Sequence, residues 1–181
     1  MTRVTLLCIS LILVFFLVGC MTETRVYTAQ IAEFTKNIKA DHPNVKNFKV
    51  HYTTPGFSIN YTLKKPISQN EAMELFYKTK DLYFSDRFQK EVVEDIYYKK
   101  YTMYTDNGRF PPHIYIGIVF PGNGDEKRTV HSFSADGCRA NEDGLECNTQ
   151  YPIWGYDYLV DGKFVKHCSI EENSIECKDI E

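Results

Sequence analysis

The stretch that decides the fold is NFKVHYTTPGFSINYTL, residues 47–63. Apolar residues alternate with polar ones in its first half (FKVHY) and again in its second half (FSINYTL). This period of two is typical of a β-strand with one buried face, and Pro55-Gly56 between the two runs indicates a turn. The stretch therefore predicts a β-hairpin, and another element must cover one face of that hairpin.

The elements that follow the hairpin are predicted to be helices that supply this cover. Ser68-Gln69-Asn70-Glu71 matches a capping box, in which Ser68 accepts a hydrogen bond from the third backbone amide and Glu71 reaches back to the cap. Apolar residues at helical spacing predict one helix to about Phe84 and a second from Asp86 to about Tyr98.

A helix is also predicted before the hairpin, over residues 24–40. Its apolar residues recur at steps of four, three and four, which places them on one stripe: Tyr27, Ile31, Phe34 and Ile38. Asp41-His42-Pro43 ends this helix, because the residue before a proline avoids the helical region.

The second half of the chain is predicted to be rich in strands. Apolar residues alternate in IYIGIVF (114–120), and a polar loop, GNGDEKR, leads to a second strand, TVHSFSA (129–135). The strands YDYLV and KFVKH flank Asp161-Gly162, which favours a tight hairpin turn. The order helix, two strands, two helices and then many strands predicts an α+β fold. We expect an antiparallel sheet with helices on one face and a disulfide-stapled, β-rich C-terminal third.

Four cysteines lie in two similar stretches near the C-terminus, CRANEDGLEC (138–147) and CSIEENSIEC (168–177). Each stretch has a polar turn near its middle, so each predicts a hairpin in which the two cysteines face one another across the strands. We therefore predict the disulfides Cys138–Cys147 and Cys168–Cys177. Pairing of the two hairpins with each other is the main alternative, and a metal site is a weaker one.

The N-terminus has the pattern of a secretion signal. After Met1-Thr2-Arg3, residues 4–19 carry no charge and are almost wholly apolar. This run is short for a membrane-spanning helix, which needs about 20 residues, and has the length of a signal-peptide core. An uncleaved membrane anchor is the alternative interpretation.

The run ends in Leu17-Val18-Gly19-Cys20, which resembles the lipobox of bacterial lipoproteins. The resemblance implies that the Cys20 thiol receives diacylglycerol and that residues 1–19 are removed. Residues 20–23 would then form a short tether and residues 24–181 a single domain. Because Met21 replaces the aspartate typical of inner-membrane retention, the resemblance implies the periplasmic face of the outer membrane in a Gram-negative organism. In a Gram-positive organism it implies the outer face of the plasma membrane.

Composition narrows the range of partners. The formal net charge of −3 becomes −4 once Arg3 is removed, so nothing favours binding to nucleic acid. The membrane would be reached through the lipid, and another envelope or secreted protein is the expected partner. The sequence predicts no cofactor, no metal site and no catalytic residue.

One stretch, His131-Ser132-Phe133-Ser134-Ala135-Asp136, contains the residue types of a hydrolytic triad. Triads depend on three-dimensional geometry, however, and adjacent strand residues point to opposite faces. A strand with a polar face is therefore the favoured interpretation of this stretch.

Aromatic residues supply the candidate binding surface: Tyr101, Tyr104, Trp154, Tyr156 and Tyr158. Such residues dominate interface hot spots, although alternation from position 154 to 158 also fits the buried face of a strand. The leading functional hypothesis is a non-enzymatic binding module, either an assembly factor or an inhibitor. The alternative is an envelope hydrolase with His131 as its base.

Overall fold

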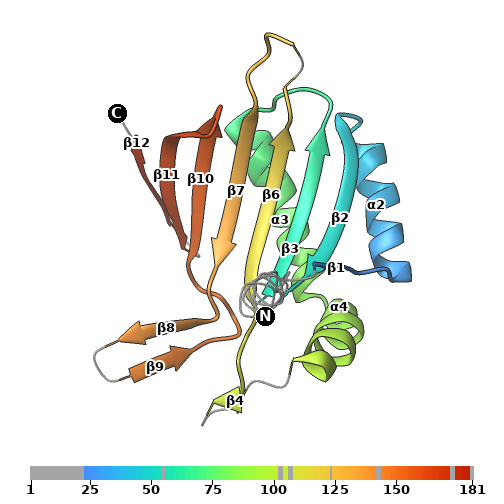
Figure 1. Cartoon of the computed structure of the whole chain (residues 1–181), viewed down its shortest axis with the longest axis vertical. Coiled ribbons are helices and arrows are strands. Elements are labelled where there is room, and N and C mark those ends of the chain that lie inside the picture. The colour runs from blue at the N-terminus through green and yellow to red at the C-terminus, as the bar shows by residue number, and fades with distance from the viewer. Residues whose placement is uncertain are drawn as a thin grey trace, which may run out of the picture.

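The computed structural model describes residues 23–53, 56–101, 104–105, 108–122, 124–141, 144–171 and 174–179. The predicted signal segment (residues 1–19), Cys20 and Pro55 lie outside these residues. Within them, the main sheet has eight strands in the order β1-β2-β3-β6-β7-β10-β11-β12. Figure 1 shows this sheet with the helices behind it and at one side.

The predicted hairpin is confirmed as β2 (Val45–Tyr52) and β3 (Gly56–Leu63), which pair antiparallel. The helix before it, α2, spans Ala29–Asp41 and ends where predicted. Its predicted start at residue 24 is wrong, because Thr24–Arg25 forms the short strand β1 against β2. The Thr28 side chain accepts a hydrogen bond from the Ile31 amide and so caps the helix. Tyr27 therefore precedes the helix and is 72% exposed.

The two helices after the hairpin are confirmed. Helix α3 spans Gln69–Phe84, and its capping box is present with both hydrogen bonds between Ser68 and Glu71. A second helical segment begins with α4 (Asp86–Phe88) and continues as η1 (Gln89–Tyr98), which is a wider π-helix. The Ser85 side chain accepts from the Phe88 amide and caps this segment.

The remaining strands of the main sheet are β6 (His113–Phe120), β7 (Thr129–Ala135), β10 (Trp154–Val160), β11 (Lys163–Glu171) and β12 (Ser174–Asp179). Asp161 and Gly162 both have positive φ angles, 51° and 78°, as the tight turn between β10 and β11 requires. The sheet is antiparallel except where β3 pairs parallel with β6. That exception follows from the helical connection, which returns the chain to the end of the sheet where β3 began.

Both predicted disulfides are confirmed. Cys168 of β11 lies directly opposite Cys177 of β12 and is bonded to it. Cys138–Cys147 joins β8 (Cys138–Asn141) to β9 (Gly144–Cys147), a hairpin that projects from one end of the main sheet (Figure 1). A second small pair, β4 (Tyr104–Thr105) and β5 (Gly108–Arg109), lies near the same end.

The core lies between the sheet and α3. Phe76 of α3 stacks on Phe133 of β7, with ring centroids 4.4 Å apart, and meets Trp154 of β10 edge-on at 5.1 Å. These three side chains are almost completely buried. The predicted arrangement, with the helices on one face of the sheet, is therefore correct.

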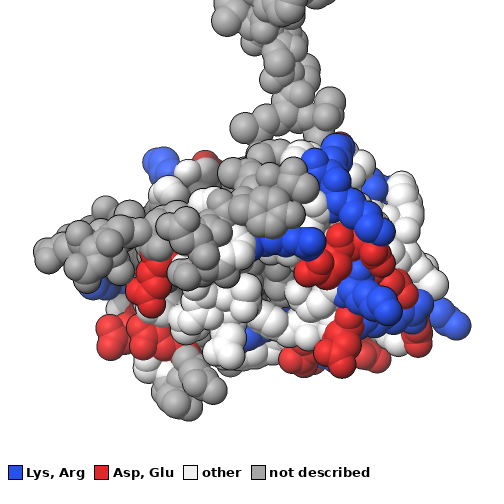
Figure 2. Space-filling model, turned by 90° about the horizontal axis from the view of Figure 1, so that it is seen from below, with Lys and Arg blue, Asp and Glu red and all other residues white. Residues whose placement is uncertain are grey.

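Charges of both signs are mixed at the end of the molecule seen from below. Lys and Arg side chains lie beside Asp and Glu side chains on the right of Figure 2, the side where α2 and α4 lie in Figure 1. Ion pairs one helical turn apart, Arg87–Glu91 and Lys99–Asp95, contribute to this pattern. In the described part of the chain, the helices are too short or too polar to cross a membrane.

Candidate functional site

The sheet has one face that no described helix covers. Val50, Ile59, Ile116, Phe133 and Tyr156 follow one another across five strands and are all buried on the face toward the helices. Because side chains alternate along a strand, the residues just before and just after each of these in its own strand point to the opposite face. That face is turned toward the viewer in Figure 1, and we call it the open face.

An apolar row crosses the open face near the end of the sheet that is at the top of Figure 1. It is formed by residues that pair directly across four strands: Val119 of β6, Val130 of β7, Leu159 of β10 and Phe164 of β11. The first three are partly buried by their neighbours, whereas Phe164 is 53% exposed and the adjacent Val165 is 41% exposed. A contiguous exposed apolar surface of this kind often marks an interaction site.

A polar row runs beside the apolar row, two residues away along β6, β7 and β10 and three residues away along β11, where the register shifts. It consists of Gly117, Ser132, Asp157 and His167, again paired directly across four strands. Nδ1 of His167 lies 2.6 Å from the Asp157 carboxylate. Gly117 and Ser132 are buried, whereas Asp157 and His167 are accessible. Asp157 and His167 therefore place hydrogen-bonding groups next to an apolar surface, which is the usual composition of a specific contact.

The polar row contains a serine, an aspartate and a histidine, but their order does not make a catalytic triad. A triad needs the histidine between the serine and the acid. Here Asp157 is in the middle, and Ser132 and His167 lie two strands apart, which is about 9–10 Å. The arrangement therefore does not let His167 take a proton from Ser132.

Tyr115 closes the centre of the open face. A Cβ atom added at Gly117 would lie 2.9 Å from the Tyr115 ring and 2.8 Å from Oδ1 of Asn60, so a larger residue there would displace one of these side chains. Burial raises the pKa of the Tyr115 hydroxyl, and an interaction with the Ser132 hydroxyl offsets part of that rise. Tyr115 thus stays a neutral hydrogen-bonding group on this face.

The structure corrects the prediction that five aromatic residues form an exposed binding surface. Trp154 and Tyr156 are each 1% exposed, because their face of β10 packs under α3, so neither can form part of an exposed surface. Tyr158 and Tyr101 are partly buried against the core, Tyr158 stacked on His131 and Tyr101 edge-on to Tyr52. The side chain of Tyr104 lies outside the described residues. The alternative interpretation, a buried strand face, is correct for Trp154 and Tyr156.

His131 is a buried histidine whose two ring nitrogens both have partners. Nδ1 lies 2.8 Å from the Tyr156 hydroxyl and Nε2 lies 3.3 Å from the Ile67 carbonyl oxygen. Its residue is 2% exposed, on the helix-covered face, whereas Ser132 points to the open face. The two residues that looked like triad partners are therefore on opposite sides of the sheet, and His131 has no exposed surface for a substrate.

The burial of His131 predicts a pH dependence of stability. Desolvation lowers its pKa below the ordinary value of 6.5, although the bond to the Ile67 carbonyl opposes this. Below pH 6.5 the unfolded chain therefore binds a proton that the folded chain does not. The folded state should lose stability as the pH falls from 6.5 toward the lowered pKa, by at most about 1.4 kcal/mol per pH unit.

Urea unfolding of the parent and of His131→Gln between pH 7.5 and pH 5 tests this prediction. Glutamine keeps hydrogen-bonding capacity at position 131 but does not titrate there. The parent should therefore lose more stability than the variant over this range. Parallel losses in the two proteins would show that His131 does not contribute.

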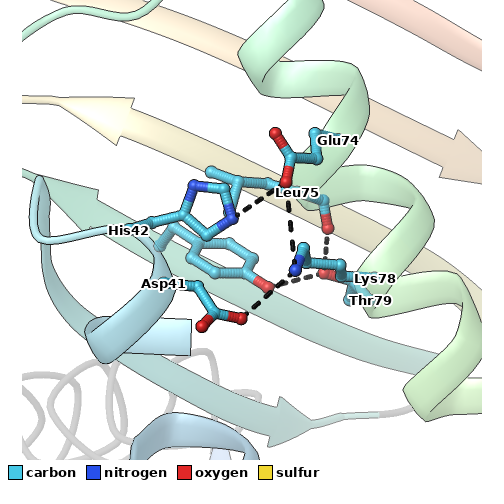
Figure 3. Close-up of polar contacts among 7 residues, drawn as sticks. Asp41, His42, Glu74, Leu75, Lys78 and Thr79 are labelled. Atoms are coloured by element: carbon cyan, nitrogen blue, oxygen red, sulfur yellow. Dashed lines mark hydrogen bonds and ion pairs between the residues drawn. The ribbon is translucent and has the colours of Figure 1, made fainter. Parts of the chain in front are cut away.

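Two other polar clusters are explained by the fold. Figure 3 shows Asp41, His42, Glu74 and Lys78 between the end of α2 and α3, with His42–Glu74 at 3.3 Å and Lys78–Asp41 at 3.3 Å. Beneath them the Thr79 hydroxyl bonds to the Leu75 carbonyl at 2.7 Å, which is an ordinary helix contact. The ion pairs are partly exposed, so they hold the two helices together only weakly.

The second cluster lies beside the first disulfide hairpin. His113 and Asp136 form a pair at 2.5 Å at the edge of a hollow of about 180 Å³. Phe110, Pro111 and Gly137 also line that hollow. Among the described residues, groups of three or more His, Cys, Asp or Glu that could hold a metal ion are absent.

The apolar row was not identified from the sequence, although a signal for it exists. Val119, Val130 and Leu159 stand at the positions of their strands that alternate with the core residues, where polar residues are expected. Apolar residues at such positions on several strands indicate a sheet with a second apolar surface. The direct pairing of these residues becomes visible only with the register of the sheet.

Comparisons with known proteins found no relative of this chain. No protein-family model matches the chain, and no curated protein or solved structure has significant similarity to it.

Proposed function

We propose that this chain is a membrane-anchored envelope lipoprotein that binds another macromolecule through the open face of its sheet. The observation that carries the proposal is the apolar row Val119–Val130–Leu159–Phe164 on a face without a covering helix. The partner is an envelope or secreted protein, whose assembly this chain assists or whose activity it inhibits. Lipid on Cys20, with removal of residues 1–19, holds the domain at the membrane.

The position of the N-terminus supports this arrangement. Glu23, three residues after Cys20, precedes β1, which pairs with the Tyr52 end of β2. Three residues reach at most about 11 Å, so this end of the sheet is held next to the bilayer. Phe57 and Ile114 pair in line with Tyr52 and so mark this same end of the sheet. Val119 lies five residues further along β6 than Ile114, which is about 17 Å. The apolar row thus lies at the end of the sheet opposite to the tethered end, where a partner in the envelope can reach it.

Chemical crosslinking and affinity capture from solubilised envelopes test the proposal with the native, lipidated chain. The chain should capture a specific partner, and Phe164→Lys should reduce its recovery about tenfold. A charge in place of a half-exposed Phe in an apolar contact is expected to cost ~1.4 kcal/mol or more. Ile175→Lys is the matched control, since Ile175 is also on a strand and 49% exposed but points to the other face. Failure to capture a partner, or equal capture by both variants, would contradict the proposal.

A further inference from the structure

A groove runs along the free edge of the sheet, between β2 and α2. Its volume is about 330 Å³. One wall is a stripe of α2 and its cap that includes Thr28, Ala32, Thr35 and Lys39. The other wall is the edge of β2 from Asn47 to Val50. The groove therefore follows an edge strand and has a helix along its other side.

The backbone of β2 in this groove is available for pairing. The Val50 carbonyl points to the free edge, because it accepts a 2.8 Å hydrogen bond from the Val26 amide at the end of β1. Residues two apart on a strand direct their backbone groups to the same side, so the Phe48 amide points to this edge too. β1 ends before it reaches Phe48. Oδ1 of the neighbouring Asn47 side chain accepts the Phe48 N–H at 3.0 Å instead.

The groove is positively charged, in a protein of formal net charge −3. Arg25, Lys39 and Lys49 line it, and none of the residues that line it is acidic. Lys39 and Lys49 make no ion pair with any residue in the described part of the chain. The Arg25 guanidinium lies over the exposed Tyr27 ring, 4.5 Å from its centroid, at the mouth of the groove. An occupant of this groove is therefore expected to carry negative charge.

We propose that an extended, acidic polypeptide segment of the binding partner adds to the edge of β2 as a further strand, in line with β1. Backbone pairing with Phe48 would provide affinity for any extended chain, and the cations would select acidic residues. This inference rests on the proposed function, since it names a second contact with the same kind of partner. It involves a different surface from the apolar row, so the two can fail separately.

The test uses the full, processed chain in detergent and fluorescent peptides of about ten residues, enough to pair along a strand. The probe is a pool of peptides in which Asp or Glu alternates with varied apolar residues. Comparison pools carry Lys in place of the acids or methyl groups on alternate backbone amides. We expect the acidic pool to bind and both comparison pools to bind much more weakly.

Two double variants distinguish an effect of the groove lysines from a general effect of net charge. Lys39→Glu combined with Lys49→Glu should weaken binding of the acidic pool about tenfold or more, because two attractive charges become repulsive. Lys90→Glu combined with Lys178→Glu makes the same change in net charge at exposed positions elsewhere and should alter binding less than about twofold. Equal effects of the two pairs, or no binding of the acidic pool, would overturn the proposal.

Strand addition has a signature that charge alone does not produce. Hydrogen exchange of the Phe48 amide should slow in the complex, because a peptide carbonyl replaces Oδ1 of Asn47 as its acceptor. Asn47→Ala removes the competing acceptor and should strengthen binding by about twofold to fivefold. An unchanged Phe48 amide in the complex would overturn the proposal.

Anionic vesicles of phosphatidylglycerol and phosphatidylethanolamine test the rival occupant, a membrane surface. Vesicle binding that depends on Lys39 and Lys49, with no binding of the acidic pool, would assign the groove to lipid and overturn the peptide proposal. If the chain captures a partner that the acidic pool does not displace and the groove variants do not affect, the groove proposal fails. The proposed function would still stand in that case.

Discussion

Phe133→Ala is expected to lower the free energy of unfolding by about 3–5 kcal/mol, since large aromatic residues removed from a core leave a cavity that only partly closes. Phe133 lies at the centre of the sheet and is completely buried. Its ring stacks on Phe76 of α3 and also contacts Tyr156 of β10, with ring centroids 4.8 Å apart. The substitution therefore weakens the contact that holds the helix layer on the sheet.

Phe164→Ala is the matched control, because the same atoms are removed from a residue that is 53% exposed. Its effect on stability should be less than about 1 kcal/mol. Urea unfolding followed by the fluorescence of Trp154, which is the only tryptophan of the chain, measures both variants. Since a domain of this size has a total stability of about 5–15 kcal/mol, the two outcomes should be well separated. Similar losses in both would show that Phe133 is not at the centre of the core.

Phe164→Ala also separates stability from binding. If Phe164 belongs to a docking face, its removal should weaken partner capture while the domain stays folded. A variant that keeps the unfolding curve but loses the partner is what distinguishes a functional apolar residue from a structural one. Substitution of Phe133 is thus expected to change stability, whereas substitution of Phe164 is expected to change binding of the partner.

The parts of the fold that sequence predicts well are those whose signals are local. The Ser68–Glu71 capping box, the Asp161-Gly162 turn and the two cysteine hairpins each depend on residues a few positions apart, and the structure confirms all of them. The predicted start of α2 at residue 24 is wrong, because two competing signals overlap there. Tyr27 fits the helical spacing of Ile31 and Phe34, but Thr28 is a better cap, and β2 pairs with the residues before it.

The features that escaped prediction depend on contacts between distant segments. β3 and β6 pair parallel only because three helical segments bring the chain back, and the strand pattern of each is the same in either direction. Alternation at Trp154 and Tyr156 shows that they share a face, but α3 decides that this face is the buried one. The apolar row likewise needs the register of four strands before its members become neighbours.

Ion pairs also differ in whether the sequence can predict them, depending on how far apart their residues lie in the chain. Glu91 lies one helical turn after Arg87, so the sequence alone suggests their contact. The pairs His113–Asp136 and His167–Asp157 instead join residues that lie 23 and 10 positions apart and become visible only in the structure. One pair of this second kind lies at the open face and the other lies beside the disulfide hairpin.

Cys20→Ser is expected to abolish both the lipid at residue 20 and the removal of residues 1–19 that follows lipidation. The resemblance to the lipobox implies that the Cys20 thiol carries diacylglycerol, and a serine hydroxyl does not replace that thiol. One acyl chain gives only marginal membrane binding, whereas two or more hold a protein stably, at about 0.8 kcal/mol for each buried methylene. After proteolytic removal of residues 1–19 from the variant, its remaining chain should therefore enter the aqueous phase in a phase-partition experiment, whereas the lipidated parent should stay in the detergent-rich phase.

Mass spectrometry of the purified chains measures the modification directly. The parent should begin at residue 20 and carry the mass of its acyl chains, and Cys20→Ser should lack that mass. Cys8→Ser is the matched control, since it makes the same change within residues 1–19, and its mature product should be identical to that of the parent. If Cys20→Ser kept the mass, the processing and the membrane association of the parent, both the lipid anchor and the membrane-bound function built on it would be wrong.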